Sequence, residues 1–306
     1  MDTTIARGCL VVGVDGSEHA NRAVIWAAEQ ADLEGRGLVL LHGSHGSRVR
    51  DGDWVTLWGA DREEVERVMG RADETLVEEA ARLATAGHPG VDVRSLVVDG
   101  DAREALVQAS RTAHLVVVGS RGRSPWRDLV LGSVTSAVYR QASCPVVVTG
   151  LPGSRSAQRG VLVGADGTAG SVPVIEFAFR MASLRGLPLT VMHCYWDISG
   201  ELTHGRVVGP GETGVDDLRL LLSESVAGMS EKFPDVEVDL QLARGLVDMA
   251  LTDRTPARDL VVVGRRHPST WSRLLYGSAT TAVLERAEGS VAVVPEPGPI
   301  TARDRQ

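Results

Sequence analysis

The sequence repeats itself at the scale of a whole domain, and this repetition limits the possible folds more than any other feature. Three segments of the first half return in the second half: a strand and turn at 11–17 and 162–168, and apolar runs at 40–42 and 191–193 and at 115–119 and 260–264. The first two pairs are 151 residues apart, whereas the third pair is 145 residues apart. Solenoid repeats have periods of roughly 20 to 50 residues, so this spacing indicates two duplicated domains.

The length agrees with this interpretation. A chain of 306 residues suits two domains of about 150 residues, each able to bury its own core. We expect the first domain at residues 1–150, a linker at 151–159 that contains Pro152 and Gly153, and the second domain at 160–306.

Within each copy, short runs rich in valine and leucine alternate with helical patterns, which predicts an α/β fold. Continuous apolar strands flanked by helices are typical of a parallel sheet that is covered on both faces. Each copy is therefore expected to be a doubly wound, Rossmann-like domain with a five-stranded parallel sheet. In the first copy, strands are predicted near 9–14, 38–41, 91–98, 115–118 and 146–149. Helices are predicted after Ser17, Arg62, Asp101 and Gly132, with Ser17 as an N-cap.

Composition excludes several classes of partner. The net charge of −8 repels a phosphate backbone, so nucleic-acid binding is not expected. No segment approaches the roughly 18 to 20 consecutive apolar residues of a membrane helix, so no membrane association is expected either. No positively charged region leads into a long apolar stretch near Asp2 and Arg7, and we therefore expect a cytoplasmic location.

A glycine pattern in the first copy predicts phosphate binding. Gly119-Ser120-Arg121-Gly122 directly follows the apolar run at 115–118, and Gly132-Ser133 comes nine residues later at the start of a predicted helix. Glycines at a strand end permit positive φ and let backbone N–H groups converge on an anion. The unpaired N–H groups and the dipole at a helix start also attract phosphate. Such short glycine patterns alone are more often plain turns, but the paired arrangement favours a phosphate site.

Asp15 stands at the carboxyl end of the first predicted strand. Ligands of open α/β sheets bind outside these strand ends where the strand order reverses, which makes Asp15 a candidate ribose or metal contact. The alternative is that Asp15-Gly16-Ser17 forms only a turn and a helix cap.

Together these residues resemble the ATP-binding signature of the universal stress protein family, G-x-x-G, nine residues, then G-[S/T], with a first-strand aspartate. The resemblance spans nearly the whole chain. It implies phosphate contacts at Gly119, Gly122, Gly132 and Ser133, a ribose contact at Asp15, adenine packing near Val14, Gly43 and Val118, and a further nucleotide contact at Val134. It also implies dimerisation through the last strand of each domain. In a tandem chain these strands, 144–148 and 291–294, can pair with each other within one chain. The alternative is a homodimer of two chains.

The second copy departs from the signature at one position. It reads Gly264-Arg265-Arg266-His267, then nine residues, then Gly277-Ser278, so His267 replaces the second glycine and Pro268 follows. A histidine side chain obstructs the phosphate approach, and proline has no N–H donor. Asp166, Gly264, Gly277 and Ser278 remain as candidate nucleotide contacts. We expect a weakened or altered second site.

The pattern favours nucleotide binding over catalysis. There is no G-x-x-x-x-G-K-[S/T] loop, and no residues beyond Asp15 are found to organise phosphoryl transfer, so no catalytic residue is assigned. The leading hypothesis is a stress-response protein that binds ATP as a sensor or regulator and hydrolyses it slowly at most. Whether magnesium or manganese binds together with the nucleotide is left open. A scaffold that works without nucleotide and a true nucleotide hydrolase are the alternatives.

Overall fold

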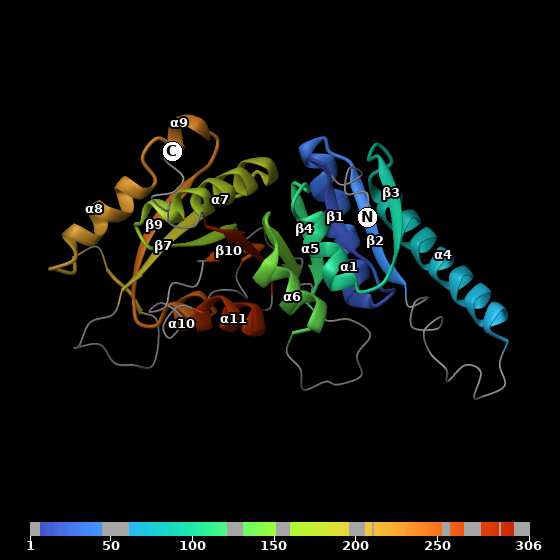
Figure 1. Cartoon of the computed structure of the whole chain (residues 1–306). Coiled ribbons are helices and arrows are strands. Elements are labelled where there is room, and N and C mark those ends of the chain that lie inside the picture. Colours follow the sequence, from blue (N-terminus) through green and yellow to red (C-terminus); the bar gives the residue numbers. More distant parts are fainter. Residues whose placement is uncertain are drawn as a thin grey trace, which may run out of the picture. The chain divides into compact units, whose positions relative to one another are not determined.

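The computed structural model describes residues 7–44, 61–120, 131–150, 160–195, 206–209, 211–252, 258–265, 277–287 and 289–296. The chain divides into two compact units, Met1–Thr149 and Gly150–Gln306, called the first unit and the second unit below. The first unit runs from blue to green in Figure 1, and the second from yellow to red. No helix in the described ranges is both long and apolar enough to cross a membrane.

The first unit contains all five predicted strands and all four predicted helices. Its strands are β1 (Leu10–Gly13), β2 (Leu38–Ser44), β3 (Val93–Asp99), β4 (Leu115–Gly119) and β5 (Val146–Thr149). Its helices are α1 (Glu18–Glu34), α4 (Arg62–Gly87), α5 (Ala102–Ala109) and α6 (Ser133–Gln141). The strands pair in parallel in the order β3-β2-β1-β4-β5, so the strand order reverses between β1 and β4. The carboxyl ends of β1 and β4 therefore form the switch point where ligands bind in such sheets.

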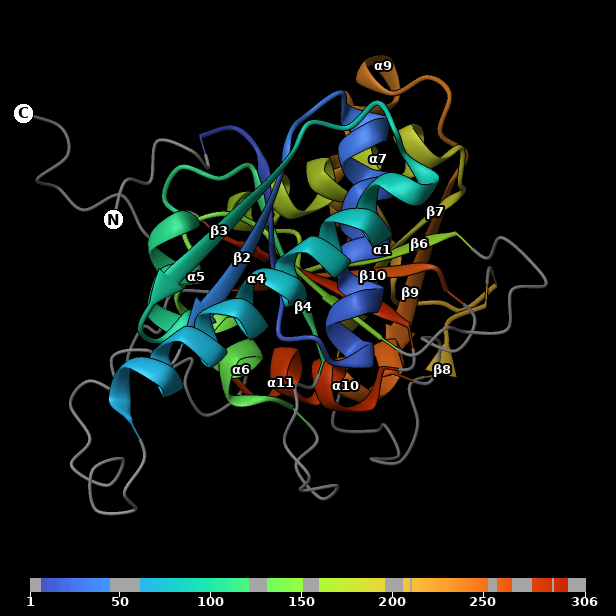
Figure 2. The same ribbon diagram turned by 90° about the vertical axis from the view of Figure 1, so that its right-hand side faces the viewer.

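Two pairs of helices cover this sheet. Helix α1 packs beside α4, as Figure 2 shows, and α5 packs beside α6. Right-handed crossovers place the first pair on one face and the second pair on the other, which makes the unit doubly wound. Ser17 caps α1 as predicted, because its side chain accepts a hydrogen bond from the N–H of Ala20 at 3.1 Å. The predicted apolar face of α1 is buried, with Ala20, Val24, Ala27, Ala28 and Ala31 at most 4% exposed.

The second unit repeats this plan with additions. Its strands are β6 (Val161–Ala165), β7 (Leu189–Tyr195), β8 (Arg206–Val207), β9 (Val238–Arg244), β10 (Leu260–Arg265) and β11 (Ser290–Pro295). Its helices are η2 (Ala169–Ser171), α7 (Val172–Arg185), α8 (Asp216–Ser225), α9 (Met229–Lys232), α10 (Val247–Thr252) and α11 (Gly277–Arg286). The strand order is β11-β10-β6-β7-β9-β8, and only the short strand β8 pairs antiparallel among the strands described. The sequence patterns did not predict β8.

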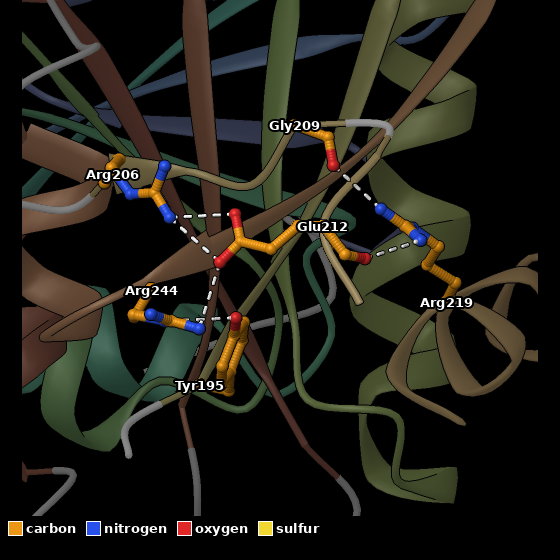
Figure 3. A network of polar contacts seen from close by, with 6 residues as sticks. All are labelled: Tyr195, Arg206, Gly209, Glu212, Arg219 and Arg244. Carbon is orange, nitrogen blue, oxygen red and sulfur yellow. Dashed lines mark hydrogen bonds and ion pairs between the residues drawn. The ribbon is translucent and has the colours of Figure 1, made fainter. Parts of the chain in front are cut away.

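A cluster of charged side chains holds β8 and the following turn against the ends of β7 and β9 (Figure 3). Arg206 donates to both carboxylate oxygens of Glu212, at 2.9 and 2.8 Å. Arg244, the last residue of β9, contacts the same carboxylate at 3.0 Å and lies 3.3 Å from the hydroxyl of Tyr195, the last residue of β7. Arg219 donates to the backbone oxygen of Glu212 at 3.4 Å. These contacts join β8 and the following turn to the last residues of β7 and β9.

Candidate functional site

The turn after β1 positions Asp15 at the switch point. Its Oδ1 accepts a hydrogen bond from the N–H of Ser17 at 2.9 Å, which forms the turn that leads into α1. Gly16 has a φ of +76°, a conformation that favours glycine. Asp15 therefore has the turn role that we weighed as the alternative to ligand binding. This hydrogen bond uses only one of the two oxygens of its carboxylate. Contact of Asp15 with a ribose stays a prediction.

A buried histidine fixes the end of β1 to β2 and α4. Nδ1 of His42 lies 2.8 Å from the backbone oxygen of Val14, and Nε2 lies 3.0 Å from Oδ1 of Asp73. A carbonyl oxygen can only accept, so Nδ1 of His42 donates to Val14, while Nε2 faces the carboxylate of Asp73. The second unit repeats half of this arrangement, because Nδ1 of His193 lies 2.9 Å from the backbone oxygen of Ala165.

The end of β4 lies directly against the start of α1. A Cβ atom built on Gly119 would be 2.8 Å from the backbone carbon and oxygen of His19. Gly119 is not among the glycines with positive φ in the described residues, so the conformational freedom of glycine is not what this position uses. Glycine is required there because another backbone approaches closely, which sequence spacing does not reveal.

Gly119 is also tied to the start of α6. The buried hydroxyl of Thr135 donates to the backbone oxygen of Gly119 at 2.7 Å, and the N–H of Gly132 donates to the backbone oxygen of Ser120 at 3.0 Å. Gly132 is the N-cap of α6, with φ of −66° and ψ of 153°. We call Gly119 together with the first turn of α6 the first cradle.

The first turn of α6 contains Ser133, a predicted phosphate contact, and Val134, a predicted nucleotide contact. The first helical hydrogen bond runs from the N–H of Ser136 to the oxygen of Gly132, at 2.9 Å. The amides of residues 133–135 consequently have no acceptor within the helix, and they carry the positive end of its dipole. Ser133 is exposed. The structure thus brings Gly119, Gly132 and Ser133 together, whereas Gly122 lies outside the described residues.

Three side chains beside the first cradle were missed by sequence reasoning. Nδ1 of His19 lies 2.8 Å from a guanidinium nitrogen of Arg22 and 3.1 Å from the hydroxyl of Ser120. Because guanidinium nitrogens only donate, Nδ1 of His19 accepts from Arg22. The arrangement places the cationic Arg22 near the end of β4. In the sequence, only the helical spacing of His19 and Arg22 hinted at this arrangement. The contact of His19 with Ser120 joins residues that are 101 positions apart.

The predicted adenine contacts are packed into the fold. Val14 and Val118 are 5% and 3% exposed. A Cβ built on Gly43 would be 2.8 Å from Cβ of Ala102, so this glycine allows α5 to approach β2. Val14 also lines a cavity of about 200 Å³ between α1 and α4, which is smaller than the roughly 300 to 1,000 Å³ of ligand pockets. Adenine contact at these three residues stays a prediction.

The second unit repeats the backbone of this site. Oδ1 of Asp166 accepts from the N–H and the hydroxyl of Thr168, at 2.9 and 2.7 Å. The hydroxyl of Thr280 donates to the backbone oxygen of Gly264 at 3.2 Å, as Thr135 does to Gly119. Helix α11 begins at Gly277, followed by Ser278. We call Gly264 together with the first turn of α11 the second cradle. His267 and Pro268 lie outside the described residues, so their effect stays a prediction.

Comparisons with known proteins agree on one family. The model of the universal stress protein family matches residues 9–150 and, a second time, residues 159–295. A universal stress protein of Mycobacterium tuberculosis is 32% identical over 298 residues, covering 94% of this chain and 96% of the relative. One of Mycolicibacterium smegmatis is 30% identical over 298 residues, covering 93% of this chain and 96% of the relative. The crystal structure of a universal stress protein from Archaeoglobus fulgidus shares the fold, with a TM-score of 0.66, 21% identity and coverage of 94% of this chain and 96% of that one.

Proposed function

This chain belongs to the universal stress protein family, and on that premise we propose that its first unit binds ATP and reports nucleotide status as a sensor or regulator in a stress response. The proposal assigns the triphosphate to the first cradle and the ribose to Asp15. Adenine then lies toward Val14, Gly43 and Val118. Any hydrolysis of ATP is slow. The proposal leaves open whether magnesium or manganese binds together with the nucleotide.

The observation that carries this proposal is the construction of the first cradle. Thr135 joins the end of β4 to the first turn of α6 at 2.7 Å, which holds the N–H groups of that turn beside the strand end. Rigid donors bind an anion well because they lose little freedom when it arrives. Arg22 adds a positive charge beside the strand end through His19, at 2.8 Å. This combination suits a phosphate better than the plain turn that short glycine patterns usually form.

The proposal predicts one tight nucleotide site in the intact chain. Calorimetric titration of the purified full chain with ATP should give a stoichiometry near one. Any second binding event should have an affinity roughly ten- to a hundredfold weaker. Mass spectrometry of nucleotide released on denaturation gives an independent readout. Absence of any nucleotide binding would favour the scaffold alternative, and two equal sites would contradict the asymmetry between the units. Single-turnover assays with magnesium or manganese then separate a sensor from a hydrolase.

Replacing Asp15 tests its assignment to the ribose. Asp15→Ala should weaken ATP binding about tenfold, since a hydrogen bond to a charged group contributes roughly 1.5 to 3 kcal/mol. The turn must be controlled for, because Oδ1 of Asp15 also accepts from Ser17 at 2.9 Å. Asp15→Asn keeps an oxygen for that turn and removes the charge. Unchanged affinity in both variants, measured by calorimetry, would remove Asp15 from the site.

Pairing of the two units through their last strands stays a prediction of the family resemblance. Each of these strands, β5 and β11, stands at one end of the strand order of its own unit and is rich in valine. Exposed apolar edge strands invite aggregation, so proteins usually cover or pair them. Internal pairing and a homodimer both satisfy this requirement.

A further inference from the structure

A carboxylate stands at the strand end of the second cradle. Glu296 directly follows β11, and its N–H donates to the backbone oxygen of Arg265 at 3.0 Å. Its side chain turns toward the end of β10. A Cβ atom built on Gly264 would collide with Oε1 of Glu296, and one built on Gly170 would lie 3.1 Å from Oε2. The space that two glycines leave open is therefore filled by the two oxygens of one carboxylate.

The first unit fills the equivalent space differently. Gly119 corresponds to Gly264, and His19 corresponds to Gly170 by the offset of 151 residues. At Gly119 the atoms nearest to a built Cβ are the backbone carbon and oxygen of His19 and, at 3.0 Å, the Cβ of its side chain, which is held by Arg22 and Ser120. In the second unit, glycine in place of His19 removes that side chain, and Glu296 occupies the space. The two strand ends thus have different neighbours: the first has His19, held by Arg22, which also pairs with Glu18 at 3.8 Å, and the second has the carboxylate of Glu296.

We propose that the carboxylate of Glu296 closes the second cradle to nucleotide phosphates. The inference rests on the proposed function, because it assumes that a cradle of this construction takes phosphate. A carboxylate at the strand end repels an entering phosphate, and its oxygens occupy the room beside Gly264 and Gly170 that a phosphate oxygen would need. On this view, the second unit holds its own anion in place of a ligand. Glu296, rather than His267 and Pro268, then determines which unit binds nucleotide.

Two substitutions in the full chain test this role. Glu296→Gln removes the charge and keeps the shape, whereas Glu296→Ala removes both. Glu285→Gln is the matched control, because Glu285 is an exposed residue of α11 in the same unit and loses the same charge. Calorimetric titration with ATP should show one additional site in Glu296→Ala, with an affinity at least about tenfold above any second event of the unchanged chain. Glu296→Gln should give a smaller gain, and Glu285→Gln should give none.

The outcomes separate this inference from the proposed function. If the unchanged chain binds one ATP and Glu296→Ala binds two, both hold. If the unchanged chain binds none but Glu296→Ala binds one, the inference holds and the assignment of the first unit fails. If Glu296→Ala gains no more than Glu285→Gln, the inference is overturned whatever the unchanged chain binds. A gain with His267→Gly while Glu296 is still present would also overturn it.

Discussion

Gly119→Ala is expected to lower the free energy of unfolding of the first unit by about 3 kcal/mol, the upper range for added atoms in a packed core. The added Cβ would stand 2.8 Å from the backbone carbon and oxygen of His19. Backbone atoms cannot turn aside as a flexible side chain can, so either β4 or the start of α1 must shift. Denaturant unfolding followed by circular dichroism measures the loss.

Gly70→Ala is the matched control for this substitution. Gly70 lies in α4, is exposed, and a Cβ built there meets no atom within 4 Å. Alanine is favoured over glycine in a helix by about 1 kcal/mol, so this variant should become more stable. If the two alanine variants unfold at the same denaturant concentration, the close approach between Gly119 and His19 is wrong.

Gly132→Val is expected to weaken ATP binding by about a hundredfold. A β-branched side chain at the N-cap would stand over the first turn of α6 and block the N–H groups of residues 133–135. Two charge-assisted hydrogen bonds at roughly 1.5 kcal/mol each account for a loss of this size. Calorimetric titration with ATP measures the effect, and a change this large brings binding near the limit of detection.

The fold should survive the Gly132→Val substitution. The φ of −66° and ψ of 153° at Gly132 are extended, which valine adopts readily, although valine is a poorer N-cap than glycine. Gly90→Val is a suitable control, because a Cβ built on Gly90 meets no atom within 4 Å. Full ATP affinity in a folded Gly132→Val protein would exclude the first cradle as the phosphate site.

Features encoded by neighbouring residues could be read from the sequence. The repeat indicated two similar halves, and the alternation of apolar runs with helical patterns placed the five strands and four helices of the first unit. Ser17 was assigned as an N-cap because a cap depends on the next three residues. Gly119 and Gly132-Ser133 were expected to meet because they stand at the end of a strand and at the start of the helix that follows it. Local hydrogen bonding and periodicity were sufficient for these features.

Contacts between distant segments were decided by the tertiary structure alone. The sequence contains His19 and Gly119, but only the placement of α1 over β4 shows that a backbone, and not a positive φ, requires glycine there. The same holds for His42 with Asp73 and for Glu296 beside Gly264. A residue's type and spacing determine which element it joins, whereas strand order and packing determine which side chain from elsewhere reaches it. For this reason the sequence located both cradles, and the tertiary structure revealed that one lies beside Arg22 and the other beside Glu296.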